Sequence, residues 1–132
     1  MKIAPSILSA DFANMERDIR ELKEAGADWV HMDVMDGIFV PNISIGIPVL
    51  KSLRKATDMF IDVHLMIDEP VRYVKEFAKC GADLINFHIE ATDDVEECIR
   101  FFEDICAVTE LRAMEQRFDV AKKLHDGKVL QE

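Results

Sequence analysis

Short apolar segments alternate with amphipathic segments along most of the chain. The short segments have the length of buried strands, and the amphipathic ones repeat apolar residues at the three- and four-residue spacing of a helix. This alternation is typical of a parallel sheet whose strands are joined by covering helices. The pattern predicts strands at residues 3–8, 28–34, 59–66 and 84–90, and helices at about 12–25, 47–55, 70–80, from about 93, and 110–126.

A Gly-Ala-Asp sequence occurs twice, at 26–28 and at 81–83, each time between a predicted helix and the next strand. Glycine readily adopts the left-handed conformation with which many helices end. The repetition indicates two copies of one helix-strand unit. Glycine and proline mark residues 36–42 as a loop, and Pro70 suits the first turn of the helix that follows it.

Three of the predicted strands carry apolar side chains at alternate positions, with polar side chains between them. Successive side chains of a strand point to opposite faces of the sheet, so each of these strands has one apolar and one polar face. The polar face collects His31, Asp33, Asp62, His64, Asn86, His88 and Glu90, several of them near the C-terminal ends of the strands. Helices are expected to cover the apolar face, so the polar face must line something else. The simplest candidate is the mouth of a (β/α)₈ barrel, where active sites lie.

The pair His31 and Asp33 lies two residues apart on one predicted strand, and His64 lies on the neighbouring strand. Two imidazoles and a carboxylate suit Zn²⁺, Fe²⁺ or Mn²⁺ better than Ca²⁺ or Mg²⁺. A single histidine in such a place is more often a hydrogen-bonded core residue. Histidines on the same face of adjacent strands, beside a carboxylate, favour a site. His88 is expected to support a ligand by hydrogen bonding rather than to be one.

The composition narrows the class of protein. The 132 residues include 16 Lys and Arg against 26 Asp and Glu, which gives a formal net charge of −10. An acidic chain is poorly suited to sequence-independent nucleic-acid binding. No apolar run approaches the roughly 20 residues that span a bilayer, and the first residues lack the apolar core of a signal peptide. Three cysteines without CxxC spacing favour reduced thiols. We expect a cytoplasmic protein without membrane or nucleic-acid partners.

Four sequence motifs occur in order along the chain: APSILSAD at 4–11, HMDVMDG at 31–37, FVPN at 39–42 and DVHLM at 62–66. Together they closely resemble the ribulose-phosphate 3-epimerase family over roughly residues 2–91, and residues 92–106 are similar to the family's fourth helix. The resemblance implies a (β/α)₈ (TIM) barrel with a divalent metal ion. It also implies an isomerase of the pentose phosphate pathway that interconverts D-ribulose 5-phosphate and D-xylulose 5-phosphate.

The resemblance also implies a role for particular residues. Asp33 matches one of the family's two acid/base carboxylates, and Ser9 matches a serine that contacts the substrate. Met35 and Met66 match residues that line the pocket beside the reacting carbons, and His64 is expected to contact the substrate as well. Three of the family's four metal ligands are matched, by His31, Asp33 and His64.

From residue 107 onward the sequence departs from the family. We find no counterpart of the family's second catalytic aspartate, which lies in a Val-Asp-Gly-Gly-like turn, or of its glycine-rich phosphate loops. A whole barrel takes about 200 to 250 residues. We therefore expect residues 1–106 to form a partial barrel of about four parallel strands with covering helices, and residues 107–132 to form a divergent helical tail.

An open sheet leaves strand edges that invite pairing with another chain, so we expect a homo-oligomer. Two functions remain open. One is an isomerase of the epimerase family that carries the metal half of the site and acts on a phosphorylated ketopentose. Asp62 and Glu90 share the polar face and are candidates for the missing acid, with capping of a backbone group as the other role open to Glu90. The other is an inactive variant that binds metal or associates with other subunits.

Overall fold

The computed structural model describes residues 2–92. These residues belong to the first of two compact units, Met1–Asp93 and Asp94–Glu132. The helices predicted from about 93 and over 110–126, and the boundary predicted between 106 and 107, lie outside the described residues.

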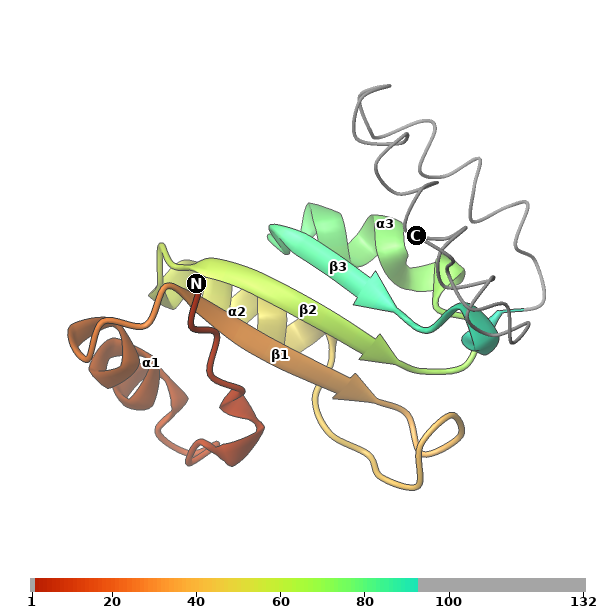
Figure 1. The fold of residues 1–132 in the computed structure, drawn as a ribbon, viewed down its shortest axis with the longest axis horizontal. Helices are drawn as coiled ribbons and strands as arrows, with labels where there is room; N and C mark the ends of the chain where they lie inside the picture. Colours follow the sequence, from red (N-terminus) through yellow and green to blue (C-terminus); the bar gives the residue numbers. More distant parts are fainter. Residues whose placement is uncertain (1, 93–132) are drawn as a thin grey trace, which may run out of the picture. The chain divides into compact units, whose positions relative to one another are not determined.

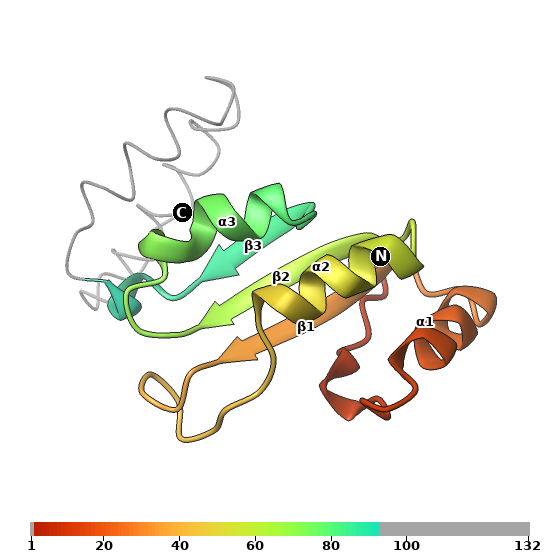
Figure 2. The same cartoon turned by 180° about the vertical axis from the view of Figure 1, so that it is seen from behind.

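Three parallel strands form one sheet in the order β1-β2-β3 (Figure 1). Helix α2 connects β1 to β2, helix α3 connects β2 to β3, and both cover the same face of the sheet (Figure 2). The arrangement is an α/β fold that corresponds to part of a (β/α)₈ barrel. The strands are Trp29–Met35 (β1), Phe60–Met66 (β2) and Leu84–Phe87 (β3), and the helices are Met15–Glu24 (α1), Ile47–Ala56 (α2) and Val71–Lys79 (α3).

The strand predicted at 3–8 is only partly present. The backbone next to Ile3 and Pro5 runs beside β1, since their carbonyl groups accept hydrogen bonds from Trp29 and His31. At Ser6 it makes only an isolated bridge, and the chain then turns into a 3₁₀ helix, η1 (Ile7–Ser9). The strand prediction is wrong beyond residue 6, because the Ser6 hydroxyl accepts a hydrogen bond from the amide of Leu8 and caps this turn. The described sheet therefore has three regular strands, not about four.

The predicted strand at 84–90 is also too long. Strand β3 ends at Phe87, and residues Ile89–Ala91 form a second 3₁₀ helix, η2. The carbonyl of Ala91 accepts a hydrogen bond from the amide of Glu69, which connects this turn to the end of β2 rather than continuing the sheet. His88 consequently lies just beyond the strand.

The predicted division between an apolar and a polar face is confirmed for β1 and β2, because the side chains on their apolar face are almost completely buried. Helices α2 and α3 pack onto that face, so hydrophobic burial on one side of the sheet orients the polar residues toward the other. The main buried apolar side chains are Val30, Met32, Val34, Ile61, Val63 and Leu65 of the sheet and Leu50, Leu53, Val74 and Phe77 of the helices.

The two Gly-Ala-Asp sequences make the same contacts. Gly26 and Gly81 both have positive φ angles, of 89° and 106°. The Asp28 carboxylate accepts a hydrogen bond from the amide of Ile3, and the Asp28 amide donates one to the Ile3 carbonyl. Asp83 makes the same two hydrogen bonds with Ile61. The repeated motif therefore ends a helix and connects the start of the next strand to the neighbouring segment by hydrogen bonds.

Candidate metal site

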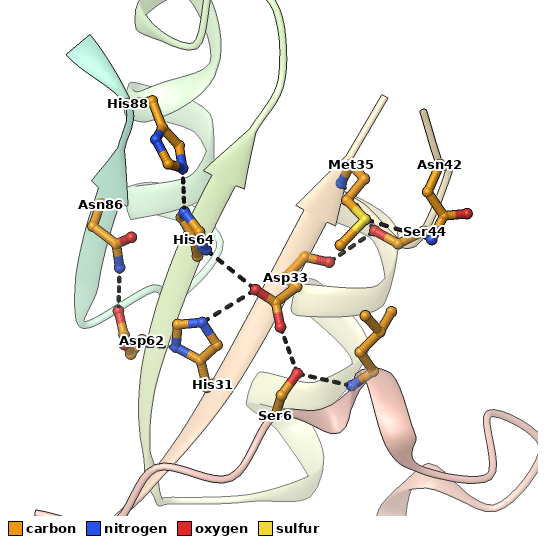
Figure 3. Close-up of polar contacts among 11 residues, drawn as sticks. Ser6, His31, Asp33, Met35, Asn42, Ser44, Asp62, His64, Asn86 and His88 are labelled. Atoms are coloured by element: carbon orange, nitrogen blue, oxygen red, sulfur yellow. Dashed lines mark hydrogen bonds and ion pairs between the residues drawn. The ribbon is translucent and has the colours of Figure 1, made fainter. Parts of the chain in front are cut away.

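Three side chains converge on the polar face of the sheet. His31 and Asp33 project from β1, and the strand register places His64 of β2 directly opposite Asp33. His31 Nε2 and His64 Nδ1 each lie 3.2 Å from Asp33 Oδ1, and the potential ligand atoms of the three residues all lie within 4.8 Å of one another (Figure 3). The period of two along β1 and the parallel pairing of β1 with β2 together build this cluster.

The second nitrogen of each imidazole also has a partner. His31 Nδ1 lies 2.8 Å from Asp62 Oδ2, and His64 Nε2 lies 3.0 Å from His88 Nε2. Such contacts orient an imidazole and leave its opposite nitrogen directed at the cluster. His88 thus has the supporting position that the sequence pattern suggests, with its ring also next to that of Phe39.

The two carboxylate oxygens of Asp33 have different surroundings. Oδ1 faces the imidazoles, whereas Oδ2 accepts a hydrogen bond from the Ser6 hydroxyl. Burial alone raises the pKa of Asp33, but the Ser6 hydroxyl and the nearby His31 and His64 rings outweigh it, and the pKa lies below its ordinary value. Asp33 is therefore a carboxylate at neutral pH.

A hydroxyl from the following loop fixes the end of β1. Ser44 Oγ donates a hydrogen bond of 2.7 Å to the carbonyl of Asp33 and accepts one of 2.9 Å from the amide of Met35. These bonds hold the backbone on both sides of residue 34 and fix the point from which the Asp33 side chain projects.

The donor set fits a transition-metal ion. Each side chain offers one nitrogen or oxygen atom to a common point, and the side chains remain between 14% and 23% exposed, so an ion can reach them. Imidazole and carboxylate donors of this kind suit Zn²⁺, Fe²⁺ and Mn²⁺.

The comparisons with known proteins identify the family. The sequence matches the Ribulose-phosphate 3 epimerase family over residues 2–112, which is most of the chain. The chain belongs to this family. The match extends past residue 106, where the resemblance in the sequence motifs ends.

Curated epimerases from distant organisms are similar to the chain. A ribulose-phosphate 3-epimerase of Bacillus subtilis is 49% identical over 104 residues, which are 79% of this chain and 48% of that protein. One from Synechocystis is 57% identical over 67% of the chain and 38% of its own length. The "Ribulose-phosphate 3-epimerase, cytoplasmic isoform" of Oryza sativa subsp. japonica is 54% identical over 70% of this chain and 41% of its own length. The chain thus spans about half the length of the curated relatives it matches, or less.

The structure separates the two serines of the first epimerase motif. Ser6 contacts Asp33, whereas Ser9 lies in η1, where its side chain is exposed. Sequence reasoning singled out Ser9 and missed Ser6. The signal available in the sequence was that Ser6 is the one polar side chain of the predicted strand at 3–8.

The two methionines assigned to the epimerase pocket lie opposite each other in the register, at the ends of β1 and β2. The Asn42 amide donates a weak hydrogen bond to the sulfur of Met35, with a separation of 3.6 Å. Both Met35 and Met66 are partly exposed on the strand face that carries Asp33 and His64. They are therefore placed beside the cluster and remain accessible to a ligand.

Proposed function

We propose that this chain provides the metal-binding and proton-abstracting part of a ribulose-phosphate 3-epimerase, which interconverts D-ribulose 5-phosphate and D-xylulose 5-phosphate in the cytoplasm. The observation that carries the proposal is the convergence of His31, Asp33 and His64 in a member of this family. These three residues would hold one Zn²⁺, Fe²⁺ or Mn²⁺ ion. The described residues 2–92 contain no helix long and apolar enough to cross a membrane.

Epimerisation next to a ketone requires removal of a weakly acidic C–H proton. A bound divalent ion would polarise the ketone and stabilise the negative charge that develops on the substrate. Asp33 would act as the base through Oδ2, because Oδ1 is directed at the imidazoles. The Ser6 hydroxyl orients Oδ2, and the lowered pKa keeps Asp33 in the ionised form that a base requires. Met35, Met66, His64 and Ser9 are the residues that we propose to contact the phosphorylated ketopentose.

A second candidate is a metal-binding chain that does not turn over substrate by itself. Inversion requires a second acid on the opposite face of the planar intermediate. Among the described residues, Asp62 already binds His31 and Asn86, and the Glu90 side chain is 67% exposed beside His88. Association with other subunits belongs to this candidate.

A coupled assay for xylulose 5-phosphate formation separates the two candidates. Purified protein loaded with Zn²⁺, Fe²⁺ or Mn²⁺ is expected to show turnover that disappears in Asp33→Asn, because the amide is not a base. The Asp58→Asn variant is a matched control, since this carboxylate pairs with Lys23 and is 81% exposed. Metal binding without turnover in any of the loaded forms would favour the second candidate.

A further inference from the structure

The carboxylate of Asp36 connects two loops at the C-terminal ends of the strands. Its Oδ1 accepts hydrogen bonds of 2.8 Å from the amide of Ile38 and 3.1 Å from that of Phe39. Its Oδ2 accepts one of 2.7 Å from the amide of Asp68. Residues 38 and 39 belong to the loop after β1, whereas Asp68 belongs to the loop after β2. One side chain therefore satisfies backbone donors of both loops.

The loop after β1 is also fixed where it returns toward the sheet. Ile43 forms an isolated antiparallel bridge with Asp36, and the Ser44 hydroxyl binds the end of β1. Gly37 has a φ angle of 79°, and a Cβ atom there would lie 2.9 Å from the Ile43 side chain, so this tight turn requires glycine. The place of Phe39 between these fixed points depends on the turn that the Asp36 carboxylate caps.

Phe39 connects this loop to the candidate metal site. Its ring centroid lies 5.2 Å from that of His88, which follows β3. The His88 ring in turn lies beside that of His64, with 5.1 Å between the centroids (Figure 3). His88 also has the Glu90 carboxylate 3.6 Å from its Nδ1, but that side chain is 67% exposed and constrains the ring weakly. The packing of Phe39 is therefore the firmer restraint on the outer side of this row of rings.

We propose that Asp36 is a positioning residue of this site, which holds the loops after β1 and β2 together and thereby keeps Phe39 packed against His88. Neither Asp36 nor Phe39 is among the three side chains that converge as ligands. The proposal deepens the proposed function and rests on it for the presence of a metal ion. The contact between Phe39 and His88 belongs to the metal-free protein and can be measured there.

Two substitutions at position 36 separate the two connections. In Asp36→Asn the amide oxygen can still accept from Ile38 and Phe39, but the NH₂ group then faces the Asp68 amide and cannot accept from it. This variant keeps the turn and loses the connection between the loops. Asp36→Ala loses both. The contact between Phe39 and His88 should therefore weaken in Asp36→Asn and weaken further in Asp36→Ala.

The direct test is proton NMR of the carbon-bound ring hydrogens of His88 in the full chain, free of metal and at about pH 8, above the ordinary imidazole pKa. His88 is assigned by the loss of its signals in His88→Gln. Phe39→Leu keeps an apolar side chain but removes the aromatic ring, so the difference between it and the unmodified protein measures the ring-current shift that Phe39 causes. We expect this shift to shrink in Asp36→Asn and to be almost lost in Asp36→Ala.

Asp28→Asn is the matched control. The Asp28 carboxylate also accepts a backbone amide, that of Ile3, but at the opposite end of β1. Its loss should lower stability without moving the His88 signals. Hydrogen exchange should be faster at the Asp68 amide in Asp36→Asn, and at the Phe39 amide as well in Asp36→Ala. Circular dichroism establishes that each variant is folded. No shift difference between the unmodified protein and Phe39→Leu, or an equal change in Asp28→Asn, overturns the proposal.

Metal affinity gives a second measure. Competition between the protein and a chromogenic chelator for Zn²⁺ should show weaker binding in Phe39→Leu and in Asp36→Ala. The loss is expected to reach at most about 10-fold, the lower end of the effect of direct partners of metal-binding histidines, because these residues act through His88. Asp28→Asn should bind Zn²⁺ as the unmodified protein does.

The outcomes separate this positioning role from the proposed function. If the His88 signals respond as expected but the unmodified protein binds no Zn²⁺, the positioning of Phe39 holds and the metal-dependent function fails. If Zn²⁺ binds but Asp36→Ala leaves the His88 signals unchanged, the positioning role is overturned and the function stands. An unchanged Zn²⁺ affinity in Asp36→Ala also overturns the role of Asp36 in the site, even where the His88 signals move.

Discussion

The chemistry of the site depends on which atom of each residue is already engaged. Asp33 presents one oxygen to two imidazoles and the other to Ser6, and His31 and His64 each use one nitrogen for a supporting contact. The remaining nitrogen of each imidazole consequently faces the same oxygen, Asp33 Oδ1, at 3.2 Å. The same residue types with other hydrogen-bond partners would not form a binding site.

The Ser6 hydroxyl is expected to control the basicity of Asp33. Ser6→Ala removes a hydrogen bond that stabilises the carboxylate, so the pKa of Asp33 should rise. Carbon-detected NMR titration of the metal-free protein measures this pKa. Ser9→Ala is the matched control and should leave it unchanged. A shift caused by Ser9→Ala but not by Ser6→Ala would contradict the assignment of these serines.

Asp36 should contribute pH-dependent stability. Burial alone raises its pKa, but hydrogen bonds from the amides of Asp68, Ile38 and Phe39 outweigh this and hold the pKa below the ordinary value of 3.8. A carboxyl whose pKa is lowered in the folded state stabilises it above the ordinary pKa. That contribution is lost as the pH falls through the folded-state value.

The test is urea unfolding of the unmodified protein and of Asp36→Asn at several pH values. The variant should be less stable by a constant amount from pH 7 to about pH 5, where the unfolded carboxyl is ionised. The difference should shrink below about pH 3.8. A difference that grows on acidification would show that Asp36 acts in another way.

The two glycines that end helices, Gly26 and Gly81, have different surroundings. A Cβ atom on Gly81 would overlap with side-chain carbons of Arg54, whereas one on Gly26 would meet nothing within 4 Å. The Arg54 guanidinium is held by the carbonyls of Thr57 and Met59 and by the Asp83 carboxylate, so it cannot move aside without losing hydrogen bonds.

Gly26→Ala and Gly81→Ala should therefore differ in stability. Each places a side chain at a positive φ angle, which costs about 1 to 2 kcal/mol. Gly81→Ala should cost more than Gly26→Ala, because the displaced Arg54 adds to the strain. Urea unfolding measures both free energies. Equal losses would mean that Arg54 rearranges freely.

The sheet formed by the described residues is open at β3, and this has a consequence for association. Within residues 2–92, β3 has a strand neighbour on one edge only, and Leu84 on this strand is 41% exposed. Unpaired edges favour association with another chain, and charged side chains on an edge oppose it.

We expect the purified chain to self-associate in a concentration-dependent way. Sedimentation velocity should show species larger than the 15.1 kDa monomer. Leu84→Lys should shift the distribution toward the monomer, because it places a charge on the edge strand. Sedimentation as a monomer at every concentration, with or without the substitution, would exclude the homo-oligomer.

Features that depend on local periodicity could be predicted from the amino-acid sequence. Alternation along β1 and β2 assigned the buried face and placed His31, Asp33 and His64 on the opposite one, since successive side chains of a strand must point to opposite sides. The family motifs matched the same strands. The helices predicted at 47–55 and at 70–80, the second of them from Pro70 at its start and Gly81 after its end, agree with α2 and α3 to within one residue at each boundary.

The contacts between polar side chains became clear only in the folded chain. Ser6 rather than Ser9 reaches Asp33, and Asn86 reaches Asp62, because the chain turns at η1 and because β3 lies in a particular register against β2. Turns and strand register depend on contacts between residues far apart in sequence. A single sequence records the donors and acceptors of those contacts but not their pairing.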